Sequence, residues 1–323
     1  MEIRTNRAKH PEKLANPLNG QKDLLGAFLF LVFLLEPASR LDQKSCRKHH
    51  QGVPVDFFDD FLEPEHRMCF DTSRKFAEKE IAPHAHKWEE AGLFDRELYF
   101  KAAQAGILGI GFPESLGGSG GNALHQVMSI EGLMRGGSTG VCVGLGTVGI
   151  ALPALVQNVT PHLENTMIRP SLAGEKISAL AITEPGTGSD VSGIRTRAEK
   201  DGSSYIVNGA KLFITSGVRA DFWTTLVRTD KDPHGGLSFL VLERGMPGIT
   251  ISSPLKKTGW HASDTAELSF ENVRVPKSNL VGPQGSGFVT LMQNFQTERL
   301  ALAAYGCATA QICIEEAQRY AKE

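Results

Sequence analysis

The sequence has almost no net charge. Its 34 lysine and arginine residues are balanced by 36 aspartate and glutamate residues, which leaves a formal net charge of −2. A chain this close to neutrality lacks the global attraction to nucleic acid that strongly basic proteins have. We therefore expect no nucleic-acid partner, and an anionic ligand would need a local basic patch.

Cysteine is scarce and scattered. The five thiols are Cys46, Cys69, Cys142, Cys307 and Cys313. They form no CxxC pair and none of the spacings of a metal site, so they are typical of reduced thiols in a reducing compartment. We expect neither a disulfide framework nor a metal centre.

The conspicuous uninterrupted apolar run, residues 24–35, is short. Twelve residues of helix span about 18 Å, against about 30 Å of bilayer hydrocarbon. The run lies in a leader, residues 1–54, that lacks the amphipathic order beginning at Phe57. Four interpretations stay open: a signal peptide, a membrane-surface anchor, a mitochondrial leader, or an extension upstream of the true start. We favour the last.

In the rest of the chain the spacing of apolar residues changes twice. A length of 323 residues favours about two domains. Residues 55–174 show helical spacing, residues 175–282 are short apolar runs between turn residues, and helical spacing returns in residues 283–323. Helices, then strands, then helices predict an α+β multidomain fold and exclude the βαβ alternation of a doubly wound sheet.

The apolar runs of the middle segment predict strands. At least six of them alternate with Gly, Pro, Asn and Asp, which is typical of a barrel or a sandwich. Asn208-Gly209 between two of these runs suits a type I′ turn, so we expect a hairpin there.

Gly144, Gly146 and Gly149 form a literal GxGxxG motif. A dinucleotide-binding loop would need a strand before the motif and an acidic residue about twenty positions later. The preceding stretch is a poor strand, and Glu164 is early and follows a proline. We therefore favour a helix whose small residues allow close packing.

A glycine-rich loop, EPGTGSD at residues 184–190, follows a strand-like run. Thr183 and Ser189 offer hydroxyl groups beside it, and its two glycines allow backbone N–H groups to approach a ligand. Successive N–H groups can bind an anion. A plain loop between two strands is equally consistent with these residues.

Three ordered motifs resemble the acyl-CoA dehydrogenase family: AITEPGTGSD at 181–190, NGAKLFITSG at 208–217 and GWHASDTAELSFENVRVP at 259–276. The resemblance extends from about residue 57 to the last residue. It implies an N-terminal helical domain, a central β-barrel and a C-terminal helical bundle. Because the family continues beyond the position of Glu323, we expect the bundle to be incomplete, with the chain truncated at its C-terminal end.

The resemblance also implies an FAD site. The first motif would wrap the flavin, with contacts from Ile182, Thr183 and Ser189, and Ser189 would also lie near the CoA. In the second motif, Phe213 would cover one face of the isoalloxazine and the Thr215 hydroxyl would reach flavin N5. The whole implied site comprises Ile182, Thr183, Glu184, Pro185, Gly186, Thr187, Gly188, Ser189, Phe213, Ile214 and Thr215.

One carboxylate interrupts an apolar stripe. The helical positions i, i+3, i+4 and i+7 are occupied by Phe288, Leu291, Met292 and Phe295. Glu298 continues this stripe where a core residue is expected. It is either a stripe-edge residue paired with Arg299 or Lys322, or a buried acid whose pKa is raised to suit a proton acceptor.

The resemblance favours the proton acceptor. One branch of the family, with long-chain and isovaleryl-type dehydrogenases, carries its catalytic Glu in a Glu-Arg-Leu context, as in Glu298-Arg299-Leu300 here. Glu298 is then implied as the catalytic base, and Ser189 and Arg299 as substrate-binding residues. Another branch of the family carries its catalytic Glu nearer the C-terminus of the chain.

The implied reaction is FAD-dependent α,β-dehydrogenation of an acyl-CoA to the trans-2-enoyl-CoA, a step of fatty-acid β-oxidation. Electrons would pass to an electron-transfer flavoprotein. The alternatives are a related flavin oxidase and an inactive truncated fragment. We expect a homo-oligomer, tetramer or dimer, if the bundle is complete. The expected location is cytoplasmic for a bacterial chain and the mitochondrial matrix for a eukaryotic one.

Overall fold

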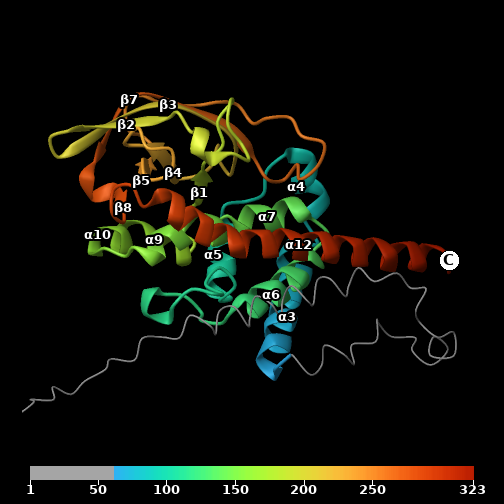
Figure 1. Ribbon diagram of the computed structural model, residues 1–323. Helices are drawn as coiled ribbons and strands as arrows, with labels where there is room; N and C mark the ends of the chain where they lie inside the picture. The colour runs from blue at the N-terminus through green and yellow to red at the C-terminus, as the bar shows by residue number, and fades with distance from the viewer. Residues whose placement is uncertain (1–61) are drawn as a thin grey trace, which may run out of the picture.

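The computed structural model describes residues 62–323 (Figure 1). The leader at 1–54, with its apolar run and Cys46, lies outside the described residues. The described chain is helical up to Leu172, forms strands between Ser178 and Val281, and closes with one long helix from Gly287. The predicted order of helices, strands and helices is confirmed.

The N-terminal part is a packed group of short helices. They are α3 (Pro64–Phe76), η2 (Ala77–Ile81), α4 (Ala85–Ala91), α5 (Glu97–Gln104), α6 (Ala123–Met134), α7 (Thr139–Gly146), α8 (Val148–Ala151), α9 (Pro153–Gln157), α10 (Pro161–Leu163), η4 (Glu164–Ile168) and α11 (Arg169–Leu172). Asn122 caps α6, because its side-chain oxygen accepts the N–H groups of Leu124 and His125. The stretch Thr139–Gln157 is apolar and long enough to cross a membrane, but it is largely buried as a core segment here.

The GxGxxG motif is helical, as expected. Gly144 and Gly146 lie in α7, and Gly149 lies in α8. A Cβ atom on Gly144 would lie 2.4 Å from the ring of Phe94, and one on Gly146 would lie 2.7 Å from the hydroxyl of Tyr305. These two glycines therefore permit close packing.

Eight strands form one mixed sheet. They are β1 (Ser178–Ala181), β2 (Arg197–Asp201), β3 (Ser204–Thr215), β4 (Phe222–Arg228), β5 (Leu237–Glu243), β6 (Ile249–Ile251), β7 (Thr265–Pro276) and β8 (Leu280–Val281). The hydrogen-bonded order is β6-β7-β3-β2-β4-β5-β8, and β1 pairs in parallel with β4. The path through the described strands thus runs from β6 to β8, and no hydrogen bonds between those two described strands close it.

The two central strands are buried on both faces. Alternate residues of β4 and β5 enter two different apolar clusters. Trp223 and Leu240 pack inside the barrel, whereas Phe222 and Phe239 pack against the helices. These strands form a wall shared by the sheet and the helical part.

The prediction of a hairpin turn at Asn208-Gly209 is wrong. β3 continues through both residues and pairs with β2 and β7, with a register shift between Val207 and Gly209. Gly209 allows Thr196 to approach the strand closely, because a Cβ atom on residue 209 would lie 2.5 Å from the Thr196 hydroxyl oxygen. The real turn is Gly202-Ser203, between Asp201 and Ser204, and Gly202 adopts a φ of 59°.

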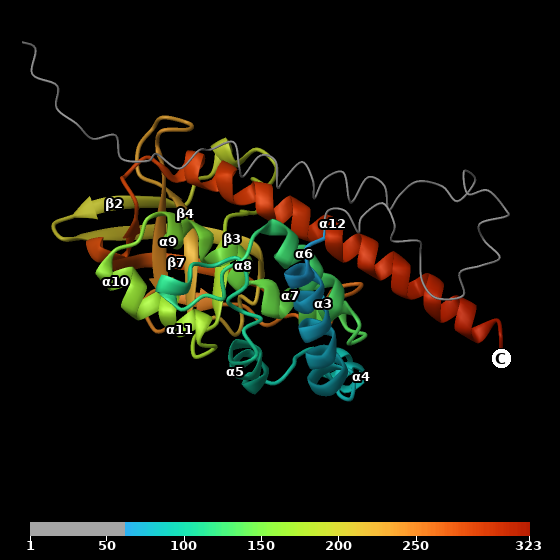
Figure 2. The same ribbon diagram turned by 90° about the horizontal axis from the view of Figure 1, so that it is seen from below.

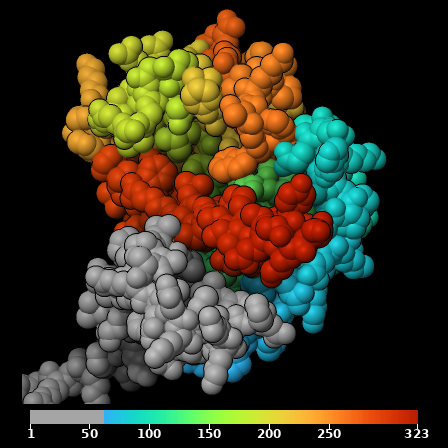
Figure 3. Space-filling model, turned by 90° about the vertical axis from the view of Figure 1, so that its right-hand side faces the viewer, coloured from blue at the N-terminus to red at the C-terminus, as the bar shows by residue number. Residues whose placement is uncertain are grey.

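In Figure 1, helix α12 (Gly287–Tyr320) runs between the strands above it and helices such as α6 and α9 below it, whereas α4 and α7 lie above it. Its first half packs on both parts, through residues such as Leu291 and Ala304. Beyond Ala308 every residue is exposed or only half-buried, and Figure 2 shows this end projecting past the rest of the described chain. In Figure 3 the helix lies at the surface between the strands and the helical part.

Candidate functional site

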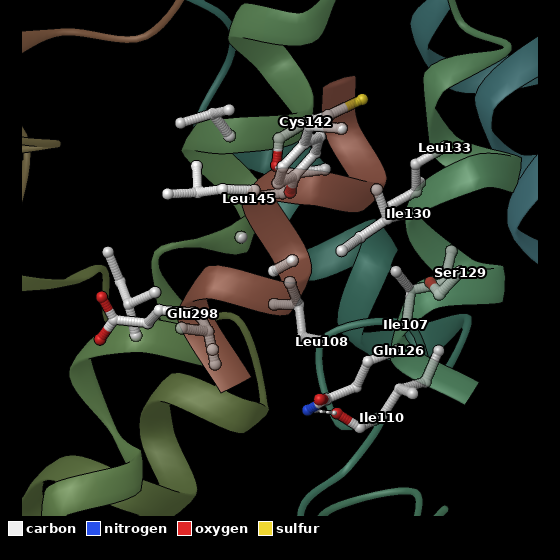
Figure 4. Close-up of a pocket in the computed structure, with 18 of the residues that line it drawn as sticks. Ile107, Leu108, Ile110, Gln126, Ser129, Ile130, Leu133, Cys142, Leu145 and Glu298 are labelled. Atoms are coloured by element: carbon white, nitrogen blue, oxygen red, sulfur yellow. Dashed lines mark hydrogen bonds between the residues drawn. The ribbon is translucent and has the colours of Figure 1, made fainter. Parts of the chain in front are cut away.

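An apolar cavity of about 310 Å³ lies among α6, α7, α8, α12 and the segment 107–112. Its walls carry mainly aliphatic side chains, including Ile107, Leu108, Ile130, Leu133, Leu145 and Val148. Figure 4 shows Glu298 on one side of this space, with Ile110, Gln126 and Ser129 on the opposite side. Thr215, at the end of β3, also contributes to the wall. The fold therefore brings two of the predicted site residues, Glu298 and Thr215, to one cavity.

Glu298 is the one charged side chain among the described residues that line the cavity. Burial raises its pKa to about 7, and the positive charge of Arg299 only partly opposes this. Among the described ion pairs, none joins Glu298 to Arg299 or Lys322. A carboxyl that loses its proton near neutral pH, in an apolar cavity, suits proton abstraction.

Asn294 holds this carboxylate in place, and our sequence analysis did not identify it. Its Nδ2 donates to Oε1 of Glu298 at 2.7 Å and to the carbonyl oxygen of Ile150 at 3.0 Å. Asn294 is 2% exposed. The available indication was its position, four residues before Glu298 on the same helix, where the two side chains face each other.

The two residues that the resemblance assigned to substrate lie outside the cavity lining. Arg299 is exposed, and its guanidinium lies over the ring of Phe295, 5.6 Å from the centroid. Ser189 is exposed in the loop after β1. Neither lines the cavity, so any substrate contact they make would be with a group outside it.

The glycine-rich loop lies beside β3. The N–H of Leu212 donates to the carbonyl oxygen of Thr183 at 2.8 Å, and Glu184 and Thr187 exchange backbone hydrogen bonds. Ile182 is buried, whereas Pro185 is exposed. The first predicted cofactor segment is therefore fixed directly against the second, which contains Phe213, Ile214 and Thr215.

The two glycines of this loop are not required by the protein itself. A Cβ atom on Gly186 or Gly188 would meet no atom within 4 Å, and neither residue has the left-handed backbone that favours glycine. Both are exposed. Open space above unhindered backbone is the geometry expected where a ligand approaches closely.

Glu184 faces inward rather than toward that space. It forms a buried ion pair with Lys211 at 2.9 Å and accepts the N–H groups of Arg195 and Thr196. Burial alone would raise the pKa of Glu184, but the charge of Lys211 and these hydrogen bonds bring it below its ordinary value. Lys211 also donates to the carbonyl oxygen of Ile182. The side chain of Glu184 thus connects the two predicted cofactor segments.

Two bulky aromatic residues beside the site have strained backbones. Phe213 has a φ of 60° and is 63% exposed, and Trp260 has a φ of 56° and is 42% exposed. Left-handed backbone is unfavourable for such side chains and is found mainly at functional sites. Trp260 also lines the cavity, and our sequence analysis did not assign it a role. The exposed aromatic rings and the open glycine loop fit a large planar ligand.

The sequence was also compared with known proteins. A family model described as acyl-CoA dehydrogenase, N-terminal domain, matches residues 63–175, and one described as acyl-CoA dehydrogenase, middle domain, matches residues 179–273. The mitochondrial long-chain specific acyl-CoA dehydrogenase of Sus scrofa is 38% identical over 262 residues, which are 80% of this chain and 61% of that protein. The chain thus spans 61% of the length of this relative. A short-chain specific acyl-CoA dehydrogenase of Clostridium acetobutylicum is 34% identical, over 81% of this chain and 69% of that protein.

Solved structures show the same fold. A probable acyl-CoA dehydrogenase from Mycobacterium abscessus is 51% identical with a TM-score of 0.79, covering 81% of this chain and 70% of that one. A glutaryl-CoA dehydrogenase from Mycobacterium smegmatis in complex with FADH2 is 27% identical with a TM-score of 0.72, covering 80% and 66%. A structure titled electron transferring flavoprotein of Acidaminococcus fermentans is 35% identical with a TM-score of 0.77, covering 81% and 69%.

Proposed function

Because this chain belongs to the acyl-CoA dehydrogenase family, we propose that it binds FAD and dehydrogenates an acyl-CoA between its α and β carbons. The observation that carries the proposal is Glu298, a half-buried carboxylate in an otherwise uncharged apolar cavity. The product is the trans-2-enoyl-CoA, since the substrate loses one proton and one hydride.

In this proposal Glu298 takes the α-proton. Its pKa of about 7 leaves a substantial ionised fraction at neutral pH, and a base of that strength is well matched to proton transfer. Asn294 holds the carboxylate by the hydrogen bond to Oε1 and is itself held by Ile150. The apolar walls exclude water, so the base meets the acyl chain in a fixed orientation.

FAD, when bound, supplies the acceptor for the β-hydride. The residues that would hold it are those of the loop 182–189 and of the segment Phe213, Ile214 and Thr215. The loop offers unhindered backbone at Gly186 and Gly188, and Phe213 offers an exposed aromatic face. Thr215 lines the cavity together with Glu298, which supports a role for Thr215 where cofactor and substrate would meet. The side chain of Glu184 fixes these segments from the inside.

For the electrons we propose an electron-transfer flavoprotein as the acceptor. The support is family membership and the likeness to the Acidaminococcus structure whose title names such a protein. An oxidase would instead deliver the electrons to oxygen, so oxygen consumption with an acyl-CoA separates the two.

The test is an anaerobic titration of the FAD-loaded chain with a panel of acyl-CoAs. We expect loss of the oxidised-flavin absorbance in the wild type, and a rate about 10²- to 10⁴-fold lower in Glu298→Gln. Glu316→Gln, at an exposed position of the same helix, is the matched control and should bleach at the wild-type rate. A chain that takes up no FAD contradicts the proposal. Wild-type bleaching by Glu298→Gln would place the base elsewhere.

A further inference from the structure

The cavity beside Glu298 has room for much more than a short acyl group. An engineered cavity of about 150 Å³ holds benzene, with six carbon atoms. The volume of about 310 Å³ here is twice that, which corresponds to roughly ten to twelve carbon atoms. A four-carbon chain would leave most of the apolar wall without contacts, at a cost in dispersion energy.

The cavity lining includes residues spread over about two turns of α12, from Glu298 to Tyr305. At one end Asn294 bonds to Ile150 beside Glu298, and at the other the Tyr305 hydroxyl donates to the carbonyl oxygen of Cys142 at 3.2 Å. Glu298 and Tyr305 are seven residues apart on one helix, or about 10 Å along its axis. Both residues line the cavity, so an extended chain can lie along α12 from the base toward Tyr305.

Small residues keep the middle of this path open. Where α7 and α8 face α12 across the cavity, the wall carries Gly146, Gly149 and Ala301. A Cβ atom on Gly149 would meet no atom within 4 Å. The last glycine of the GxGxxG motif thus borders free space, which a bulkier residue would occupy.

On the side of the cavity opposite Glu298, the polar side chains already have hydrogen-bond partners. Ser129 is hydrogen-bonded to Ser73 at 2.9 Å, and Gln126 donates weakly to the carbonyl oxygen of Ile110 at 3.4 Å. No Lys, Arg or His is among the described lining residues. A second carboxylate at the end of the acyl chain would therefore be buried without a partner, which is costly.

We infer that this site selects apolar acyl chains of about ten to twelve carbons rather than short-chain or dicarboxylic acyl groups. This inference rests on the proposed function, since it takes the cavity as the acyl site. Volume, length and uncharged walls each support it independently of the reaction.

The experiment measures binding without turnover. S-alkyl-CoA thioethers with four to sixteen carbons lack the carbonyl group and cannot be dehydrogenated. Their dissociation constants for the FAD-loaded chain are measured by calorimetry, with free CoA as the reference. We expect the affinity to rise about fourfold per methylene group and to level off at about ten to twelve carbons.

The variant Ala301→Leu tests whether the acyl chain lies along α12. It adds three carbon atoms at the middle of the cavity wall and should move the plateau to chains about three carbons shorter. Ala303→Leu places the same side chain on an exposed position of the same helix and should leave the series unchanged. Both replacements keep a good helix former.

Three results overturn the inference: a plateau at four to six carbons, equal affinity at every length, or an unchanged series in Ala301→Leu. The wild-type plateau stands as a test even where that variant fails to fold. A chain that shows the plateau but bleaches no flavin keeps the length selection and loses the dehydrogenase proposal. A chain that binds no thioether of any length contradicts both.

Discussion

Asn294 and Glu298 are joined by a hydrogen bond of 2.7 Å from the amide nitrogen to the carboxylate, one turn apart on α12. The same amide nitrogen donates to the carbonyl oxygen of Ile150, so the carboxylate is connected through Asn294 to the backbone of α8. The orientation of Glu298 is thus set by a contact between α12 and α8.

Replacing Asn294 should change the acidity of Glu298. The amide bond favours the ionised carboxylate, so Asn294→Leu should raise the pKa of Glu298 further, by about one unit. The pH dependence of anaerobic flavin bleaching should move to higher pH by the same amount. Gln293→Leu, at the exposed neighbouring position, is the control and should leave the profile in place. A lower rate with an unshifted profile would contradict this role.

Glu298 should also destabilise the folded chain at neutral and alkaline pH. Its folded pKa of about 7 lies above the value of about 4.3 in an unfolded chain, so ionisation costs stability as the pH rises through this range. Glu298→Gln cannot ionise. Its free energy of unfolding should equal that of the wild type near pH 4 and exceed it by up to about 3 kcal/mol at pH 8.

Denaturant unfolding at the two pH values checks this prediction. Glu316→Gln, at an exposed site on the same helix, should show a much smaller pH-dependent difference. A constant difference between Glu298→Gln and the wild type at both pH values would show that the carboxyl is not desolvated.

Gly186 and Gly188 should matter to a ligand and not to the fold. Because a side chain at either position meets only open space, Gly186→Val and Gly188→Val should change the free energy of unfolding by no more than about 0.5 kcal/mol. The affinity for FAD, followed by flavin fluorescence, should fall at least tenfold. Gly306→Val, at an exposed glycine of α12 that is equally unhindered, should leave the affinity unchanged. Wild-type affinity in both loop variants would remove the loop from the cofactor site.

The buried pair of Glu184 and Lys211 should be costly to break. Removing one partner leaves a buried charge, which typically costs about 3–5 kcal/mol. Glu184→Leu should be the more harmful change, because Lys211 would keep only the Ile182 carbonyl oxygen, whereas Lys211→Met leaves Glu184 with two backbone N–H groups. The double variant should be less destabilised than the sum of the two. Strict additivity in denaturant unfolding would show that the pair is not coupled.

The order of helices and strands is predicted well from the sequence, because the spacing of apolar residues reflects burial and repeats over many residues. Alternating runs and helical spacing persist through local irregularities, and the apolar stripe on α12 leads to Glu298, which lines the cavity. The hairpin at Asn208-Gly209 failed because the turn preference of two residues was outweighed by the pairing of β3 with strands on both sides. Tertiary pairing decides such cases.

The geometry of the site depended on contacts between distant segments. Nothing in the sequence near Asn294 indicates that Ile150 lies beside it, and Trp260 stands in a loop without periodicity. Glu184 belongs to a motif that resemblance assigns to the cofactor, yet its side chain faces Lys211. A shared motif therefore locates a site without saying which way each side chain points.

The wall formed by β4 and β5 has a consequence for how the described chain melts. Each strand supplies side chains to the barrel interior and to the helical core, so neither cluster can come apart without exposing part of the other. Thr224 adds a hydrogen bond from β4 to the carbonyl oxygen of Ala151. The helical part and the strand part, which differ so clearly in sequence, should therefore unfold as one cooperative unit. The boundary between them separates two kinds of secondary structure and does not separate two independently stable units.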